Sequence, residues 1–188
     1  ILALLMWQVK IWVRQNGEVC RSLLQRHRRW CRSIWQSMAK TDFQLAVEQT
    51  AEVSAAYEPG LRALRRAEVG KVVASDGSRL DGSLNIDDAV AQLYPNENRW
   101  DYAIGYGQKV YFVEIHPDFT GEVPKMIAKL NWLKLWLKAK APKIDALPKS
   151  APAYHWVQSG KSAILPHSRE AKLLAKYGLK PKPVLRLK

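Results

Sequence analysis

Two acidic residues, Asp101 and Glu114, lie in segments of the sequence that otherwise predict buried β-strand. Residues 100–106 and 110–115 are rich in aromatic and β-branched side chains, and Gly107-Gln108 between them is a short turn, so this region predicts a β-hairpin. A carboxylate in an apolar strand is costly to bury unless its charge is compensated. One hard cation could compensate two carboxylates on adjacent strands. The hairpin therefore indicates metal-assisted chemistry.

The chemistry can be made more specific from the alternation of side chains along a strand. Side chains repeat every second residue, so Glu114 and His116 share one face of the sheet. We expect Asp101, Glu114 and His116 to converge in one cleft. Asp101 should lie within about 10 Å of Glu114, because one hydrated ion with bonds of ~2.1 Å cannot bridge a larger gap. Oxygen ligands suit Mg²⁺ or Mn²⁺. Such an ion would assist phosphodiester hydrolysis, with His116 available as a base near neutral pH.

The first half of the chain predicts helices and loop before the hairpin. Helical spacing begins at Thr41, is interrupted at residues 58–60, and resumes over residues 61–66. Residues 70–88 predict loop with one short strand around residues 84–86. A short helix follows, and then the hairpin begins.

The strongest helix prediction spans residues 121–139, with Thr120 as its N-terminal cap and Pro124 in its first turn. The apolar stripe of this helix consists of Val123, Met126, Ile127, Leu130, Leu133 and Leu137. Four lysines are assigned to its other faces, namely Lys125, Lys129, Lys134 and Lys138.

The last part of the chain predicts a strand at residues 154–158 and a helix from Ser168 to Tyr177 that stops at Gly178. Residues 184–187 predict a final strand. The element order is therefore helix, strand, hairpin, helix, strand, helix. That order predicts an α/β fold with a small mixed central sheet flanked by helices.

An aspartate opening one strand, a short turn, and an apolar strand ending in Glu-x-basic resemble the core of the PD-(D/E)xK (restriction-endonuclease-like) nuclease superfamily. The resemblance covers about residues 41–160. It implies that Asp101 is the metal-binding aspartate and Glu114 the second acid, with Mg²⁺ or Mn²⁺ as cofactor. His116 stands where the family usually has a lysine, and Trp100 stands where a proline often precedes the aspartate.

The same resemblance implies further site residues. A lysine from the next helix could replace the missing one, and Lys125 and Lys129 are the candidates. The first helix of the family often supplies a third acid, for which Glu52 and Glu58 are available. The resemblance implies a nuclease. The alternative is a catalytically inactive module of the same fold that binds nucleic acid or a protein partner.

Charge favours a polyanionic partner. The net charge is +13, and residues 38–188 alone carry +7. A surplus of this size favours nucleic acid first and an anionic membrane surface second. The nucleic acid expected is DNA rather than RNA. Basic residues late in the chain would supply phosphate contacts; they are Lys161, Arg169, Lys172, Lys176, Lys180, Lys182, Arg186 and Lys188.

Residues 1–37 differ from the rest in composition. They hold both cysteines, four of the eight tryptophans and a net charge of +6. They predict either an upstream extension outside the native domain or a basic amphipathic arm, and residues 38–188 predict a single nuclease-like domain. No apolar run is long enough to span a membrane, so we expect no membrane association. The spacing of Cys20 and Cys31 fits neither a zinc knuckle nor a disulfide framework, which favours a reducing, cytoplasmic setting.

Three other patterns have plainer interpretations. Trp132 and Trp136, one helical turn apart, could stack on bases, but core packing or a homodimer contact is favoured. The acidic run from Asp81 to Asp87 lacks the glycine and the closing glutamate of a calcium loop, and is rejected as one. His155 and His167 are isolated, which argues against zinc.

Overall fold

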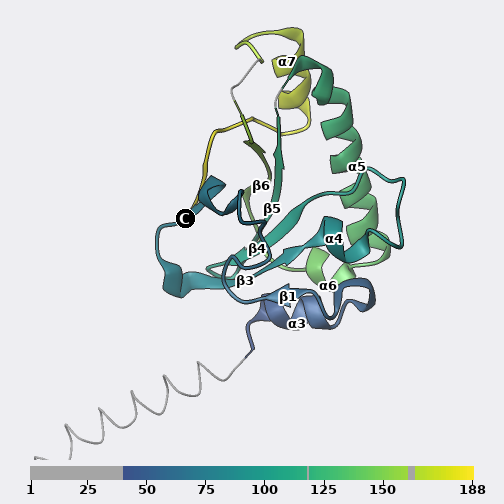
Figure 1. The fold of residues 1–188 in the computed structure, drawn as a ribbon, viewed down its shortest axis with the longest axis vertical. Coiled ribbons are helices and arrows are strands. Elements are labelled where there is room, and N and C mark those ends of the chain that lie inside the picture. Colours follow the sequence, from purple (N-terminus) through teal and green to yellow (C-terminus); the bar gives the residue numbers. More distant parts are fainter. Residues whose placement is uncertain (1–39, 118, 161–163) are drawn as a thin grey trace, which may run out of the picture. The chain divides into compact units, whose positions relative to one another are not determined.

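The computed structural model describes residues 40–117, 119–160 and 164–188, and the predicted hairpin lies at the centre of its main sheet (Figure 1). The helices and strands in chain order are α3 (Asp42–Glu48), β1 (Tyr57–Glu58), β2 (Val72–Ala74), β3 (Leu80–Asn85), α4 (Ile86–Val90), β4 (Tyr102–Tyr106), β5 (Lys109–His116), α5 (Val123–Ala139), α6 (Pro142–Asp145), β6 (Lys149–Gln158), α7 (Arg169–Lys176) and β7 (Leu185–Leu187). The compact unit that contains them spans Thr41–Lys188. The predicted extension at residues 1–37 lies outside the described residues.

The main sheet has five strands in the order β1-β3-β4-β5-β6. The neighbours from β1 to β5 are antiparallel, whereas β5 and β6 are parallel. A parallel pair needs a crossover connection, and α5 is part of the one between β5 and β6. The prediction of a small mixed sheet with flanking helices is confirmed.

The hairpin turn follows from two residues with positive φ. Gly107 and Gln108 have φ of 59° and 63°, as a two-residue turn between twisted strands requires. This turn sets the register, in which Tyr106 pairs with Lys109 and Tyr102 pairs with Val113. One step beyond this last pair, Asp101 lies opposite Glu114.

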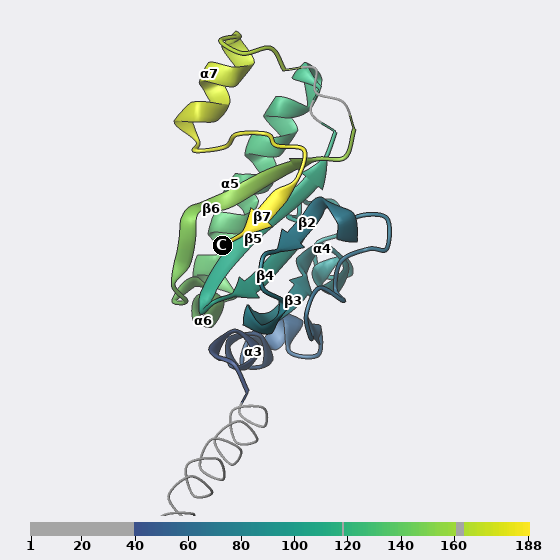
Figure 2. The same cartoon turned by 90° about the vertical axis from the view of Figure 1, so that its left-hand side faces the viewer.

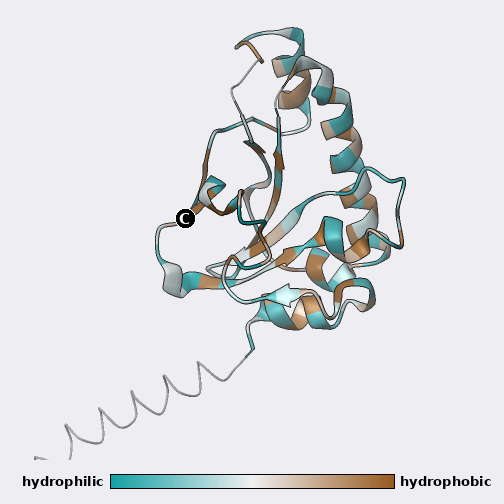
Figure 3. Ribbon diagram, viewed as in Figure 1, coloured by the Kyte–Doolittle hydropathy of each residue, from teal (hydrophilic) through white to brown (hydrophobic). Residues whose placement is uncertain are grey.

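Each face of the main sheet buries a separate apolar cluster. On one face, Ala103, Val110 and Phe112 pack with the buried side of α5. On the other face, Ile104 and Val113 pack under a small parallel sheet of β2 and β7 (Figure 2). In Figure 3, α5 carries both hydrophobic and hydrophilic residues along its length, as expected of a helix with one side on a sheet. Side chains alternate along a strand, so Glu114 lies on the same face as Val110 and Phe112, and its side chain points towards α5.

Of the two predicted N-terminal helix caps, the structure confirms one and contradicts the other. The Ser168 hydroxyl accepts a hydrogen bond from the Ala171 N–H at 3.1 Å, so the predicted cap of α7 is confirmed. The prediction that Thr120 caps α5 is wrong. A 3₁₀ turn from Thr120 to Glu122 precedes α5, and α5 has no side-chain cap.

Other elements differ in extent or in kind. The strand predicted at residues 154–158 begins already at Lys149. Residues 61–66 form turns rather than the expected helix. Strand β2 lies where loop was expected. Nowhere in the described ranges is a helix both long and apolar enough to cross a membrane.

Candidate functional site

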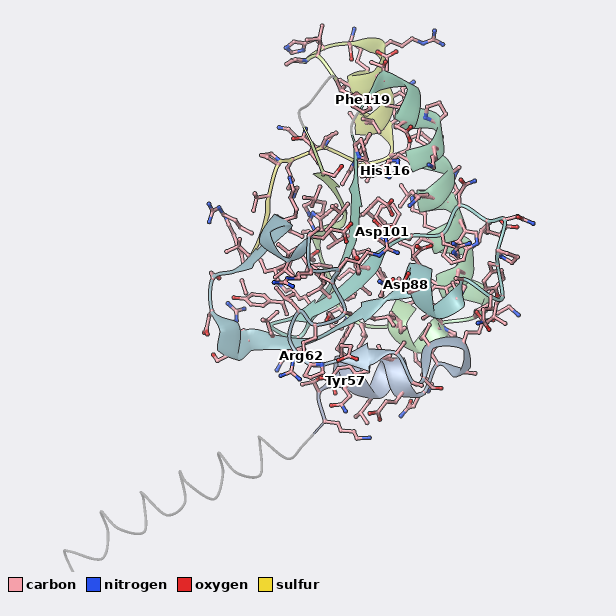
Figure 4. All side chains as sticks on the ribbon, in the orientation of Figure 1. Tyr57, Arg62, Asp88, Asp101, His116 and Phe119 are labelled. Atoms are coloured by element: carbon pink, nitrogen blue, oxygen red, sulfur yellow. The ribbon has the colours of Figure 1, made fainter. Side chains whose placement is uncertain are left out.

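A single lysine connects the two predicted acids. The Lys129 ammonium donates a hydrogen bond to Asp101 Oδ1 at 3.3 Å and another to Glu114 Oε1. Two oxygens bonded to one nitrogen lie well within the expected limit of about 10 Å. Figure 4 labels Asp101, which lies beside α5. The expected convergence of Asp101 and Glu114 is therefore present.

Backbone hydrogen bonds hold the two carboxylates in place. The N–H of Asp101 donates to Glu114 Oε2 at 3.0 Å, and the N–H of Ile115 donates to Asp101 Oδ2 at 2.9 Å. Each strand thus binds the carboxylate of its neighbour. Such reciprocal bonds fix the two side chains relative to each other, in addition to the bonds from Lys129.

The electrostatics of the site follow from its burial. Glu114 is fully buried and Asp101 is 8% exposed. Burial, and then the charge of Asp101, raise the pKa of Glu114 well above its usual range, although Lys129 opposes this shift. Burial would lower the pKa of Lys129, but the two carboxylates outweigh it and raise that pKa. One ammonium facing two carboxylates leaves a negative charge that favours a further cation or a proton.

Helix α5 brings Lys129 to the site but not Lys125. The side chain of Lys129 is 12% exposed and lies on the buried side of α5 with Met126 and Leu133. The sequence assigned Lys129 to another face of the helix, and that assignment was wrong. Lys125 is half exposed, and its ammonium lies 3.8 Å from Glu122 Oε2.

His116 lies next to the site and has an acidic partner of its own. Its Nε2 is 2.7 Å from Glu122 Oε2. Its carbonyl accepts a hydrogen bond from Trp156 Nε1 at 3.0 Å, which fixes the end of β5. In the hydrogen bonds of the described residues, the imidazole contacts Glu122 rather than Asp101 or Glu114. The sequence did not identify Glu122 as its partner, because the turn between β5 and α5 sets their distance.

The two candidates for a third acid lie elsewhere. Glu52 accepts hydrogen bonds from Trp136 Nε1 at 2.8 Å and from the Tyr94 hydroxyl at 2.9 Å. Trp136 is seven residues beyond Lys129, which is about 10 Å along the helix axis. Glu58 is exposed on the edge strand β1. Neither glutamate joins Asp101 and Glu114.

A metal at this site would therefore have few protein ligands. Among the residues that the structure describes, no three His, Cys, Asp or Glu side chains are grouped to hold a metal ion. Mg²⁺, however, commonly binds through one or two carboxylates and keeps several waters. Each carboxylate oxygen has more than one acceptor position, so the bonds to Lys129 do not exhaust Asp101 and Glu114. The donors and the unbalanced negative charge fit one hydrated Mg²⁺ or Mn²⁺.

The tryptophan pair on α5 belongs mainly to the core. Trp132 and Trp136 stack with ring centroids 5.9 Å apart, and Trp136 is 4% exposed. Trp132 is partly buried and contacts Tyr94 edge-on. Core packing, one of the two favoured interpretations, describes both side chains.

Comparison with known proteins finds no match among family models, curated proteins or solved structures. Any function assigned to this chain therefore rests on its own residues and their geometry.

Proposed function

We propose that this protein is a Mg²⁺- or Mn²⁺-dependent nuclease that acts on DNA. The observation that carries the proposal is the convergence of Asp101, Glu114 and Lys129 where β5 approaches its end. The order of elements supports it, because a helix, a three-stranded meander, a helix and a further strand are what the resemblance to PD-(D/E)xK nucleases implies.

Each residue has a definite task in this proposal. Asp101 and Glu114 hold the metal ion, which when bound polarises the phosphodiester and lowers the pKa of a water. Lys129 places a positive charge beside the phosphate and stabilises the charge that develops there. His116 accepts a proton, and Glu122 orients the imidazole.

A second candidate is a non-catalytic module of the same fold. The observation that favours it is also Lys129, because its ammonium already bridges both carboxylates. In that case the three residues form a structural ion-pair cluster that ties α5 to the sheet, and the positive surface binds nucleic acid without cutting it.

Cleavage separates the two candidates. The full chain is incubated with single- and double-stranded DNA and RNA in Mg²⁺, Mn²⁺ or EDTA. We expect cleavage of DNA with either metal, none in EDTA, and a loss of at least about a hundredfold in Asp101→Asn because a metal ligand is removed. Lys138→Gln, exposed at the far end of α5, is the control and should cut normally. DNA binding without cleavage by the parent protein would favour the non-catalytic module.

A further inference from the structure

A cavity of about 630 Å³ lies between α7 and the end of β6. Its walls are mainly apolar and include Ile164, Leu174 and Leu179, while Gln158 and Lys180 add polar groups. Pockets of 300–1,000 Å³ with apolar walls and a few polar groups are typical of ligand sites. Nothing in the proposed cleavage chemistry uses this cavity.

The cavity adjoins the candidate site through the paired ends of β5 and β6. Gln158, which lines it, pairs with His116 across these strands, and the N–H of Ser159 donates to the His116 carbonyl at 3.3 Å. In Figures 1 and 2, α7 lies at the end of the unit where β5 ends and α5 begins. A strand of nucleic acid at the site would therefore pass close to the cavity.

Positive charge is concentrated in the same part of the chain. Residues 164–188 hold seven basic residues and one acidic residue, a net charge of +6 out of the +7 of residues 38–188. Arg169, Lys172 and Lys176 of α7 are exposed, as is Lys180 at the cavity. The lining thus combines apolar walls with the cation of Lys180, and α7, which contributes to the lining, carries three further exposed cations. This combination suits a ligand with flat apolar faces and a phosphate.

We propose that this cavity binds an unpaired nucleobase, so that the substrate is single-stranded DNA or DNA with an unpaired end. The proposal rests on the proposed nucleic-acid function. The apolar walls contact the faces of the base, and Lys180 with the cations of α7 contacts the flanking phosphates. A base within a duplex stays stacked and cannot enter without unpairing, which costs free energy. The cavity therefore selects for strands whose bases are already free.

The test measures binding in EDTA, where metal-dependent cleavage cannot occur. Fluorescence anisotropy gives the affinity of the full chain for a labelled single-stranded 15-mer and for the blunt duplex of the same sequence. Ala171→Phe and Ala175→Leu place larger side chains on the lining of the cavity. We expect each to weaken single-strand binding about tenfold, the value of roughly one stacked base, and to leave duplex binding unchanged.

The control is Ala139→Phe, which adds the same ring to an exposed position at the other end of α5. It should bind both DNAs like the parent, and thermal unfolding checks that all variants are folded. Equal weakening of single-strand and duplex binding, or no effect of either cavity variant, would overturn the base site and leave a phosphate surface. A parent protein that binds neither DNA would overturn the nucleic-acid function as well, so the two failures are distinguishable.

Discussion

Glu114 is fully buried on the α5 face of the sheet, among residues that are otherwise apolar. Its carboxylate is satisfied by the Asp101 N–H and the Lys129 ammonium, but Asp101 brings a second negative charge. Replacing such a buried ionic cluster with apolar residues of similar volume is often neutral or stabilising. Stability alone therefore gives no reason for two acids here, whereas the proposed metal ion would require both of them.

The pKa shift of Glu114 predicts how stability depends on pH. A carboxyl whose folded pKa is raised contributes stability that is fully present below its unfolded pKa and is lost as pH rises through the folded pKa. Lys129, whose pKa is raised, stays charged across this range. We expect the free energy of unfolding of the parent to fall relative to Glu114→Gln between pH 4.5 and pH 8. Urea unfolding at several pH values measures this difference, and a parent that gains stability relative to the variant would contradict it.

Removing the shared cation should be costly. Lys129→Met leaves two carboxylates buried without a counter-charge, and we expect a loss of about 3–5 kcal/mol at pH 8. The loss should be smaller at pH 5, because Glu114 can then take up a proton. Lys125→Met, on the same helix but half exposed, is the matched control and should change stability by no more than about 0.5 kcal/mol. Equal losses in the two variants would show that Lys129 does not compensate the site.

Cleavage rates can distinguish the role of His116 from that of Glu122. If the imidazole accepts the proton, His116→Ala should lower cleavage by about 10²–10⁴-fold without weakening DNA binding. Glu122→Gln keeps the imidazole and loses only its carboxylate partner, so a smaller loss of about tenfold is expected. The rate of cleavage at saturating DNA measures both. A Glu122→Gln loss as large as that of His116→Ala would give Glu122 a direct part in the chemistry.

Among the elements, the hairpin was predictable from the sequence. The packing of its partner helix α5 was predictable only in part. The turn and the acids are local signals, so the pairing of β4 with β5 follows from residues 100–116 alone. The rotation of α5 about its axis is set by packing against the sheet. The sequence could therefore name Lys125 and Lys129 together as candidates but could not choose between them. Lys129 follows Met126 by three residues and precedes Leu133 by four, a spacing that could have placed it on the buried side.

Helix α3 packs closely against β4 because β4 has a glycine, Gly105, at the point of contact. A Cβ atom at Gly105 would lie 2.6 Å from Phe43 Cγ and 2.9 Å from Asp81 Cβ. Gly105→Ala must therefore push α3 and its Phe43 away from the sheet, and we expect a loss of about 1–3 kcal/mol in the free energy of unfolding. Gly121→Ala, with no atom within 4 Å of the added Cβ, is the control and should have little effect in the same denaturant titration. Equal effects would mean that the contact with Phe43 is not limiting.

At the scale of the whole unit, two features depend on contacts that no local pattern reveals. Strand β2 pairs in parallel with β7, more than 100 residues later, and this small sheet covers the face opposite α5. Strand β2 is only three residues long, so the sequence predicted loop there. The cavity beside α7 likewise arises where the end of β6 meets a later helix. Local sequence signals were enough to predict the α/β class. The surroundings of the site depend on long-range packing, which those signals do not contain.

The uneven charge of the unit predicts where DNA binds. Reversing Arg169, Lys172 and Lys176 to glutamate removes three cations from α7, and we expect much weaker DNA binding at low salt. Because each phosphate contact releases counterions, the slope of log K against log salt should become shallower by about two to three. A control variant reverses three exposed lysines away from α7, namely Lys109 at the start of β5, Lys138 near the end of α5 and Lys143 in α6, and changes the net charge equally. If net charge alone drives binding, the two triple variants will lose affinity alike. If the end of the unit beside the candidate site is the interface, only the α7 variant will lose both affinity and slope.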